Sequence, residues 1–279
     1  MALASEITAV ARLELAEVVR SRWLPVCLGL YGLLAAIFVL VGARESSVIG
    51  FTGMGRVLFS LCHALVLLLP LLALAVTGQV VNRARDDGTL ELWMSQPIRR
   101  SSYFLAVVLV RYLALALPLL ALLSGLVLVA RIAWAEPVPW RFLGRASAVS
   151  ACLLWAFVGL GLATSVRVRS PARAMTYVIL FWAAAVALVD FALIGMMLSW
   201  RLQPAAVFLL AALNPVQAAR LALLSAAEPE LATLGPVGFF LANRFGPAAL
   251  YGLGVAWPAL FGTAACALGL RWFRRGDIV

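Results

Sequence analysis

The chain has 279 residues, of which 65% are hydrophobic and only 12% are charged, against roughly 25% charged residues in soluble globular proteins. Its net charge is +10, and all 22 cationic residues are arginines. The arginines of a nucleic-acid-binding protein cluster on a solvated face, whereas these lie between long apolar runs. The composition therefore predicts an all-α membrane protein in contact with a lipid bilayer and argues against a nucleic acid partner.

Six segments are long and apolar enough to cross a membrane as helices. A hydrocarbon core of about 30 Å needs about 20 helical residues. The first segment lacks the small-residue cleavage site of a signal peptide, so we expect it to remain as a membrane helix. We therefore expect one transmembrane domain over residues 1–279, with membrane helices at residues 24–43, 57–81, 102–130, 146–166, 174–200 and 248–270.

The distribution of arginine predicts the orientation of these helices. An even number of membrane helices places both termini on one side. The segments on that side are short and hold more arginines than the segments on the other side. Because cytoplasmic loops are enriched in arginine and lysine, both termini are predicted to be cytoplasmic.

The N-terminal residues 5–22 are predicted to form an amphipathic helix along the membrane surface. Its candidate functional residues are Arg12 and Glu14. Glu14 falls on the apolar face of this helix, where a carboxylate needs a partner or water. Either Glu14 reaches the lipid headgroups, or it pairs with a cytoplasmic arginine or lies at a subunit contact.

A short charged stretch, RARDDGTLELWMSQPIRR, lies between the second and third apolar segments. Asp86 and Asp87 are predicted to begin a helix over residues 86–96, because acids favour a helix N-terminus. Apolar residues at helical spacing form one stripe of this helix, and they are Leu90, Trp93, Met94 and Pro97. Two interpretations stay open: a plain surface helix, or a helix that docks into a groove of a cytoplasmic partner.

Two charged residues fall inside predicted membrane helices. Asp190 lies near the middle of the fifth, and a lone carboxylate there is either functional or a hydrogen-bonded link between helices. Arg111 lies about ten residues into the third and could extend toward the inner surface. A direct pair between Asp190 and Arg111 would require equal depths in the membrane.

Residues 203–228 precede the last membrane helix and are apolar but too short to span. The residue before a proline leaves the helical region, so Asn214 and Pro215 are predicted to form the turn of an outer helical hairpin. Gln217 and Arg220 follow one helical turn apart. They could cap the hairpin or contact a periplasmic partner.

The sequence gives little support for a catalytic site or a metal site. Cysteines are far apart and show no zinc-ligand spacing, so no metal site is predicted. Without lysine the chain cannot carry the phosphate-binding motif GxxxxGK[ST], and no catalytic residues are predicted. We expect no cofactor in this chain, so any ATP and Mg²⁺ that the protein uses must be bound by a separate subunit.

The string DDGTLELWMSQPIRRSSYFLAVVLVRY after the second membrane helix, with ARLELAEVVRSRW before the first, resembles the permease subunit of a type-2 ABC exporter (ABC-2) over essentially the whole chain. The resemblance implies a homodimer in the bacterial inner membrane and an outer hairpin that helps close the outer gate. It also implies a coupling helix that contacts an ABC ATPase subunit through Asp86, Asp87, Gly88, Thr89, Leu90, Glu91, Trp93, Met94 and Pro97.

Within this family, the segment ALNPVQAARLALL (residues 212–224) is similar to the permeases of nitrous oxide reductase maturation systems. That similarity implies an ATPase subunit, a periplasmic partner and a role in assembling a copper site. Two alternatives stay open. The protein could export a drug, a lipid or a polysaccharide, or it could be a membrane anchor for assembly that transports nothing.

Overall fold

The computed structural model describes residues 2–42, 54–134, 139–188, 209, 211–227 and 235–276, and this part of the chain contains helices and no strand. Short turns join the helices within each described stretch. In chain order the helices are α1 (Ala2–Arg20), α2 (Trp23–Gly42), α3 (Met54–Thr77), α4 (Val80–Asp86), α5 (Thr89–Ser95), α6 (Arg100–Trp134), α7 (Trp140–Arg167), α8 (Pro171–Ala183), the π-helix η1 (Ala184–Leu188), α11 (Pro215–Ala227) and α12 (Gly235–Arg275).

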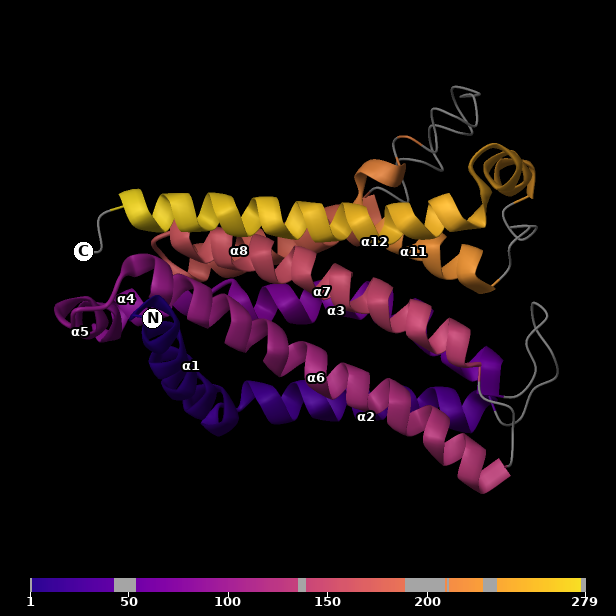
Figure 1. Cartoon of the computed structure of the whole chain (residues 1–279), viewed down its shortest axis with the longest axis horizontal. Helices are drawn as coiled ribbons and strands as arrows, with labels where there is room; N and C mark the ends of the chain where they lie inside the picture. The colour runs from indigo at the N-terminus through magenta and orange to yellow at the C-terminus, as the bar shows by residue number, and fades with distance from the viewer. Residues whose placement is uncertain are drawn as a thin grey trace.

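Five long helices, α2, α3, α6, α7 and α12, run along the long axis of the molecule (Figure 1). Each contributes to a stretch long and apolar enough to cross a membrane, and the stretch that begins in α3 continues through α4 (Val80–Asp86). This result confirms a polytopic membrane protein, with helices at five of the six predicted positions. The five stretches are Trp23–Leu40, Val57–Asp86, Arg100–Leu128, Trp140–Arg167 and Asn243–Arg275.

The predicted fifth membrane helix, residues 174–200, lies only partly within the described residues. Its first part forms α8 and the π-helix η1, which together extend from Pro171 to Leu188. Asp190 and residues 191–200 lie outside the described residues. The sixth membrane helix therefore stays a prediction.

The centre of the bundle is α7, which packs against α3, α6, α11 and α12. Glycines allow the closest of these approaches. A Cβ atom added at Gly159 would meet the backbone of Gly262 on α12, and one added at Gly262 would meet Trp155. Small residues let membrane helices pack backbone to backbone in this way, so α7 and α12 form a tight pair.

The outer surface of the bundle is apolar, as a helix surrounded by lipid requires. Leucines and isoleucines are exposed on several helices, including Leu33, Leu117, Ile179 and Leu260. A soluble monomer rarely exposes so much contiguous apolar surface. The position of these side chains agrees with helices that face a bilayer.

Helix α12 contains a kink that marks where its straight part begins. Gly246 has a φ of 73°, a left-handed conformation that breaks the helix, and glycine adopts it without steric cost. Pro247 follows, and proline is favoured at the first position of a helix. The straight part therefore begins close to the predicted start at residue 248.

Candidate functional site

The α4–α5 segment, residues 80–95, lies at one end of the bundle together with α1 and the C-terminal end of α12 (Figure 1). Helix α5 forms the extremity of the molecule in this view. A turn at Gly88 joins α4 to α5, and Gly88 has a φ of 70°. Because left-handed backbone favours glycine, the sequence DDG sets a sharp turn between two short helices.

The predicted start of the α5 helix at Asp86 is wrong. Asp86 is the last residue of α4, and Asp87 caps that helix by donating its N–H to the carbonyl oxygen of Arg83 at 2.9 Å. A glycine in left-handed conformation ends a helix, so α5 begins only at Thr89, after Gly88. The acid in the first turn of α5 is Glu91.

The predicted end of the helix is confirmed. Helix α5 stops at Ser95, and Gln96 is extended with a ψ of 155°. Because Gln96 precedes Pro97, the proline disfavours a helical conformation at that residue. Pro97 itself is exposed.

Three of the four residues in the predicted apolar stripe of α5 pack toward the bundle, whereas Pro97 is exposed. Leu90 is fully buried in the core, and Trp93 and Met94 pack against that core while half-exposed. The Trp93 ring lies 6.0 Å from the ring of Tyr103 on α6. Leu90 is therefore inaccessible to a partner in this structure, while the docking role of the other residues of the stripe stays a prediction.

The rest of the surface of the α4–α5 segment is exposed, and we call it the α5 tip. It combines acids with one large apolar side chain, since Leu92 is 69% exposed. Charge around an apolar centre is a composition typical of a protein-binding surface. The exposed residues of the α5 tip are Asp86, Asp87, Thr89, Glu91, Leu92 and Pro97.

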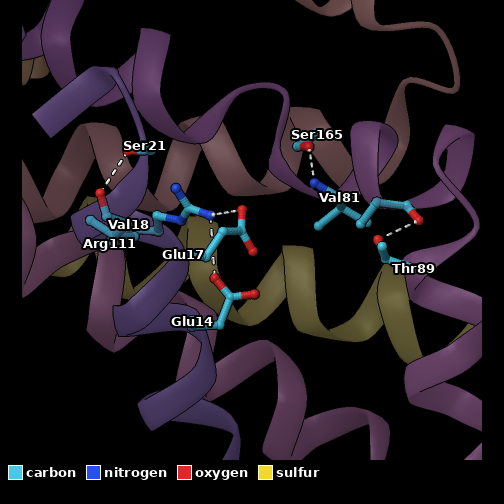
Figure 2. A network of polar contacts seen from close by, with 9 residues as sticks. Glu14, Glu17, Val18, Ser21, Val81, Thr89, Arg111 and Ser165 are labelled. Atoms are coloured by element: carbon cyan, nitrogen blue, oxygen red, sulfur yellow. Dashed lines mark hydrogen bonds and ion pairs between the residues drawn. The ribbon is translucent and has the colours of Figure 1, made fainter.

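Helix α4 is fastened to the end of α7 by a buried serine. The Ser165 hydroxyl accepts the N–H of Val81 at 2.8 Å (Figure 2) and donates to the Asn82 side-chain oxygen at 3.0 Å. The amide nitrogen of Asn82 donates to the carbonyl oxygen of Val168 at 3.4 Å. Ser165 and Asn82 are fully buried, so these bonds are shielded from water and hold α4 in one position.

Two further bonds extend this attachment toward α8. Arg85 donates to the carbonyl oxygen of Val166 at 3.2 Å, and Gln79 donates to the carbonyl oxygen of Pro171, the first residue of α8, at 3.3 Å. A displacement of α4 would therefore pull on both α7 and α8. Sequence reasoning missed Gln79, Asn82 and Ser165, although each is a polar residue close to the end of an apolar run.

Arg111 of α6 binds two carboxylates of α1. Its guanidinium nitrogen lies 3.2 Å from Glu14 and 3.2 Å from Glu17 (Figure 2). Glu14 is 4% exposed, so this contact is buried. Of the alternatives for Glu14, pairing with an arginine is therefore correct, but this arginine lies in the predicted third membrane helix and not in a cytoplasmic segment. Asp190 lies outside the described residues, and Arg12 is exposed with no ion pair among the described carboxylates.

The ionisation of Glu14 reflects two opposing effects. Burial raises the pKa of the Glu14 carboxyl, while the charge of Arg111 acts to lower it. Burial is the larger effect, because removing a carboxylate from water costs more than one shared cation returns. The Arg111 contact is therefore what makes a charged Glu14 tolerable on the apolar face of α1.

A polar cavity of about 340 Å³ joins these two regions. Glu14, Glu17 and Arg111 line one side, and Arg83, Asp87, Thr89 and Trp93 of the α4–α5 segment line the other. The charged cluster of α1 and α6 therefore faces the turn at Gly88 across a space wide enough for water.

At the other end of the bundle, the predicted turn at Asn214 is confirmed. The Asn214 side chain accepts the N–H of Val216 at 2.9 Å and donates to the carbonyl oxygen of Ala185 in the π-helix at 2.6 Å. Helix α11 begins at Pro215. Residues 203–208, in the first arm of the predicted hairpin, lie outside the described residues.

The position of Gln217 on α11 differs from one predicted role. Gln217 is buried, and its side-chain oxygen accepts a bond from Arg220 at 3.4 Å. Helix α11 packs against α3, α7 and α12. Gln217 is therefore part of the packing between helices and is not placed to contact a periplasmic partner.

Comparison with the sequences of known proteins identifies the family of this chain. A family model described as "ABC-2 family transporter protein" matches residues 8–268. The chain belongs to the ABC-2 family of transporter proteins. It is therefore a transmembrane permease of the ABC type, and the family implies an ATPase partner, as the resemblance in sequence predicted.

Two relatives share the name "Probable ABC transporter permease protein NosY". The one from Pseudomonas aeruginosa is 32% identical over 276 residues, which are 96% of this chain and 98% of the relative. The one from Stutzerimonas stutzeri is 28% identical over 238 residues, which are 83% of this chain and 86% of the relative. The similarity to NosY thus extends over nearly the whole chain.

Proposed function

We propose that this protein is the permease subunit of an ATP-driven exporter and that the α5 tip docks on a separate ATPase subunit. The observation that carries the proposal is the two-sided character of α5. Its outer side is exposed around Leu92, while its inner side is fixed to the bundle through Leu90 and Trp93. A helix that transmits force needs both an accessible face and a rigid attachment.

Two routes lead from α5 into the membrane helices. The first is aromatic: the Trp93 ring contacts Tyr103 of α6, and the Tyr103 ring stacks on Phe273 of α12 at 5.8 Å. The second is polar and runs from Asn82 of α4 through Ser165 to α7. We infer that a displacement of the α5 tip moves α6, α7 and α12 together as a rigid body.

The remaining parts of the proposal concern assembly. Six membrane helices in one chain leave a symmetric pathway to be completed by a second copy, and twofold symmetry is the commonest closed arrangement. The proposed homodimer lies in the bacterial inner membrane with both termini and the α5 tip in the cytoplasm. ATP and Mg²⁺ bind to the ATPase subunit, and this chain supplies neither catalytic residues nor a cofactor.

The cargo proposal follows the similarity to NosY. We propose a role in maturation of the copper site of nitrous oxide reductase, together with a NosF-like ATPase and a NosD-like periplasmic partner. The segment around Asn214 belongs to the matched region. Gln217 is buried, so contact with a periplasmic partner falls to other residues of the outer end.

The docking proposal is tested with a NosF-like ATPase from the same organism. We expect the full-length chain to copurify with that ATPase and to stimulate ATP hydrolysis in proteoliposomes. Glu91→Lys and Leu92→Asp should abolish both, because they reverse charge and remove apolar contact at the α5 tip. Arg141→Glu, a charge reversal at the other end of the bundle, is the control. Wild-type stimulation by both tip variants would refute the docking site.

The maturation proposal needs a cellular test. A strain that lacks the gene should produce nitrous oxide reductase with a reduced copper content, and the wild-type gene should restore it. The Leu92→Asp variant should fail to restore it while still inserting into the membrane. Full copper loading in the deletion strain would exclude this role, and the proposal that the α5 tip docks on an ATPase would remain unaffected.

A further inference from the structure

A groove of about 760 Å³ lies between α7, α8 and α12, at the same end of the bundle as α5. Three arginines line its mouth: Arg167, which ends α7, Arg169 in the connection, and Arg173 in the first turns of α8. All three are exposed. The groove lies outside the ATPase docking surface, and its role does not depend on the proposed function.

The charge at this mouth is unbalanced. No aspartate or glutamate lines the groove, and among the described residues no carboxylate forms an ion pair with any of these three arginines. Three guanidinium groups within seven residues repel one another unless an anion lies between them. The mouth is therefore complementary to a phosphate-sized anion, which arginine binds with several donors at once.

The wall of the groove below the arginines is apolar and aromatic. On α8, Arg173, Tyr177 and Phe181 follow at four-residue spacing and face one way. On α12, the lining extends from Trp272 to Phe261, a length of about 16 Å at 1.5 Å per residue. The small side chain of Ala264 leaves space between the lining of α8 and the lining of α12. The arginines and Trp272 lie at one end, and the apolar rings lie at the other.

We propose that this groove binds an anionic phospholipid from the membrane leaflet on the α5 side. The phosphate lies between Arg167, Arg169 and Arg173, and an acyl chain extends along Tyr177 and Phe181. Basic pockets between membrane helices bind anionic headgroups in this way. Trp272 lies at the level of the headgroup, where tryptophan is favoured.

A second copy of this chain is a poorer occupant. A twofold interface brings the same surface of both copies together, so a second copy seated here would have to supply acids from that surface to the three arginines. The groove supplies no acids to neutralise them. A lipid phosphate supplies the missing negative charge, and its acyl chain covers rings that are otherwise exposed.

Binding is tested on the purified full-length chain in a neutral detergent by native mass spectrometry. Phosphatidylglycerol and phosphatidylcholine with identical acyl chains are the probes. We expect phosphatidylglycerol to bind at least about tenfold more tightly. The triple variant Arg167→Gln, Arg169→Gln and Arg173→Gln should lose this preference. Arg271→Gln, Arg274→Gln and Arg275→Gln together remove the same charge from the end of α12, outside the groove, and should retain it.

A second variant tests the apolar part of the groove without changing its charge. Ala264→Trp should fill the groove and weaken phosphatidylglycerol binding about tenfold, since an exposed alanine in a helix tolerates a larger side chain. Inorganic phosphate at the same concentration should not displace the lipid. Equal affinity of the wild type for both lipids would overturn the proposal, as would equal loss in the two triple variants or displacement by inorganic phosphate.

Discussion

Arg111 compensates the charge of two acids that would otherwise be difficult to accommodate on α1. Glu14 is buried while the side chain of Glu17 is 67% exposed, and both lie 3.2 Å from the same guanidinium. Removing one partner of a buried pair leaves an uncompensated charge, which costs far more than the pair contributes. The sequence placed Glu14 on an apolar face, but only the fold shows which arginine it meets.

Arg111→Met should therefore destabilise the protein, lowering the melting temperature by roughly 10 °C at neutral pH. Glu14→Gln should have a small effect, because Glu17 still neutralises Arg111. The double variant Arg111→Met and Glu14→Gln should recover most of the loss, which a double-mutant cycle of melting temperatures in detergent measures. Additive losses in the double variant would show that Arg111 acts through packing and not through Glu14.

The melting temperature of Arg111→Met should also depend on pH, and the direction of that dependence can be predicted. Burial already raises the pKa of the Glu14 carboxyl above its ordinary value of 4.5, and without Arg111 we expect it to rise further. Because the pKa of Glu14 is higher in the folded protein than in the unfolded chain, the free energy of unfolding decreases as pH rises through the folded-state pKa. The melting temperature of Arg111→Met should therefore approach that of the wild type as pH falls toward 4.5. Glu14→Gln in the same background should remove this dependence.

At the scale of elements, the turn at Gly88 sets the direction of α5. Gly88→Ala forces a side chain into a left-handed conformation at a cost of about 1 kcal/mol. It should reduce ATPase stimulation because α5 shifts. Asparagine tolerates this conformation better, so Gly88→Asn should retain more activity. Gly144→Ala on α7, where an added Cβ meets open space, is the matched control and should stimulate like the wild type.

Hydropathy was sufficient to predict the long helices, because the length of an apolar run is a property of the sequence alone. Local chemistry likewise predicted the turn at Asn214 and the end of α5 before Pro97. The direction of the α5 stripe was not predictable, since Leu90 and Trp93 would suit a partner groove as well as their own bundle. The bonds of Ser165 were missed because they join residues more than eighty positions apart.

At the scale of the whole molecule, the arrangement of the helices predicts which segments lie on the same side of the membrane. The α5 tip lies at the end of the bundle where α1 begins and α12 finishes, and Arg141 lies at the start of α7, which ends beside α4 (Figure 1). Helix α7 has 28 residues and so extends about 40 Å, which exceeds the hydrocarbon thickness. We therefore predict that Leu92 and Arg141 lie on opposite sides of the membrane.

Labelling of Leu92→Cys and Arg141→Cys with a membrane-impermeant maleimide tests this topology in a background where the four native cysteines are serines. The excess of arginine in the segments that share the N-terminal side predicts a cytoplasmic α5 tip. Leu92→Cys should react only in inside-out vesicles, and Arg141→Cys should react in intact spheroplasts. Labelling of both from one side would contradict the bundle, and the reverse pattern would contradict the orientation and with it an ATPase at the α5 tip.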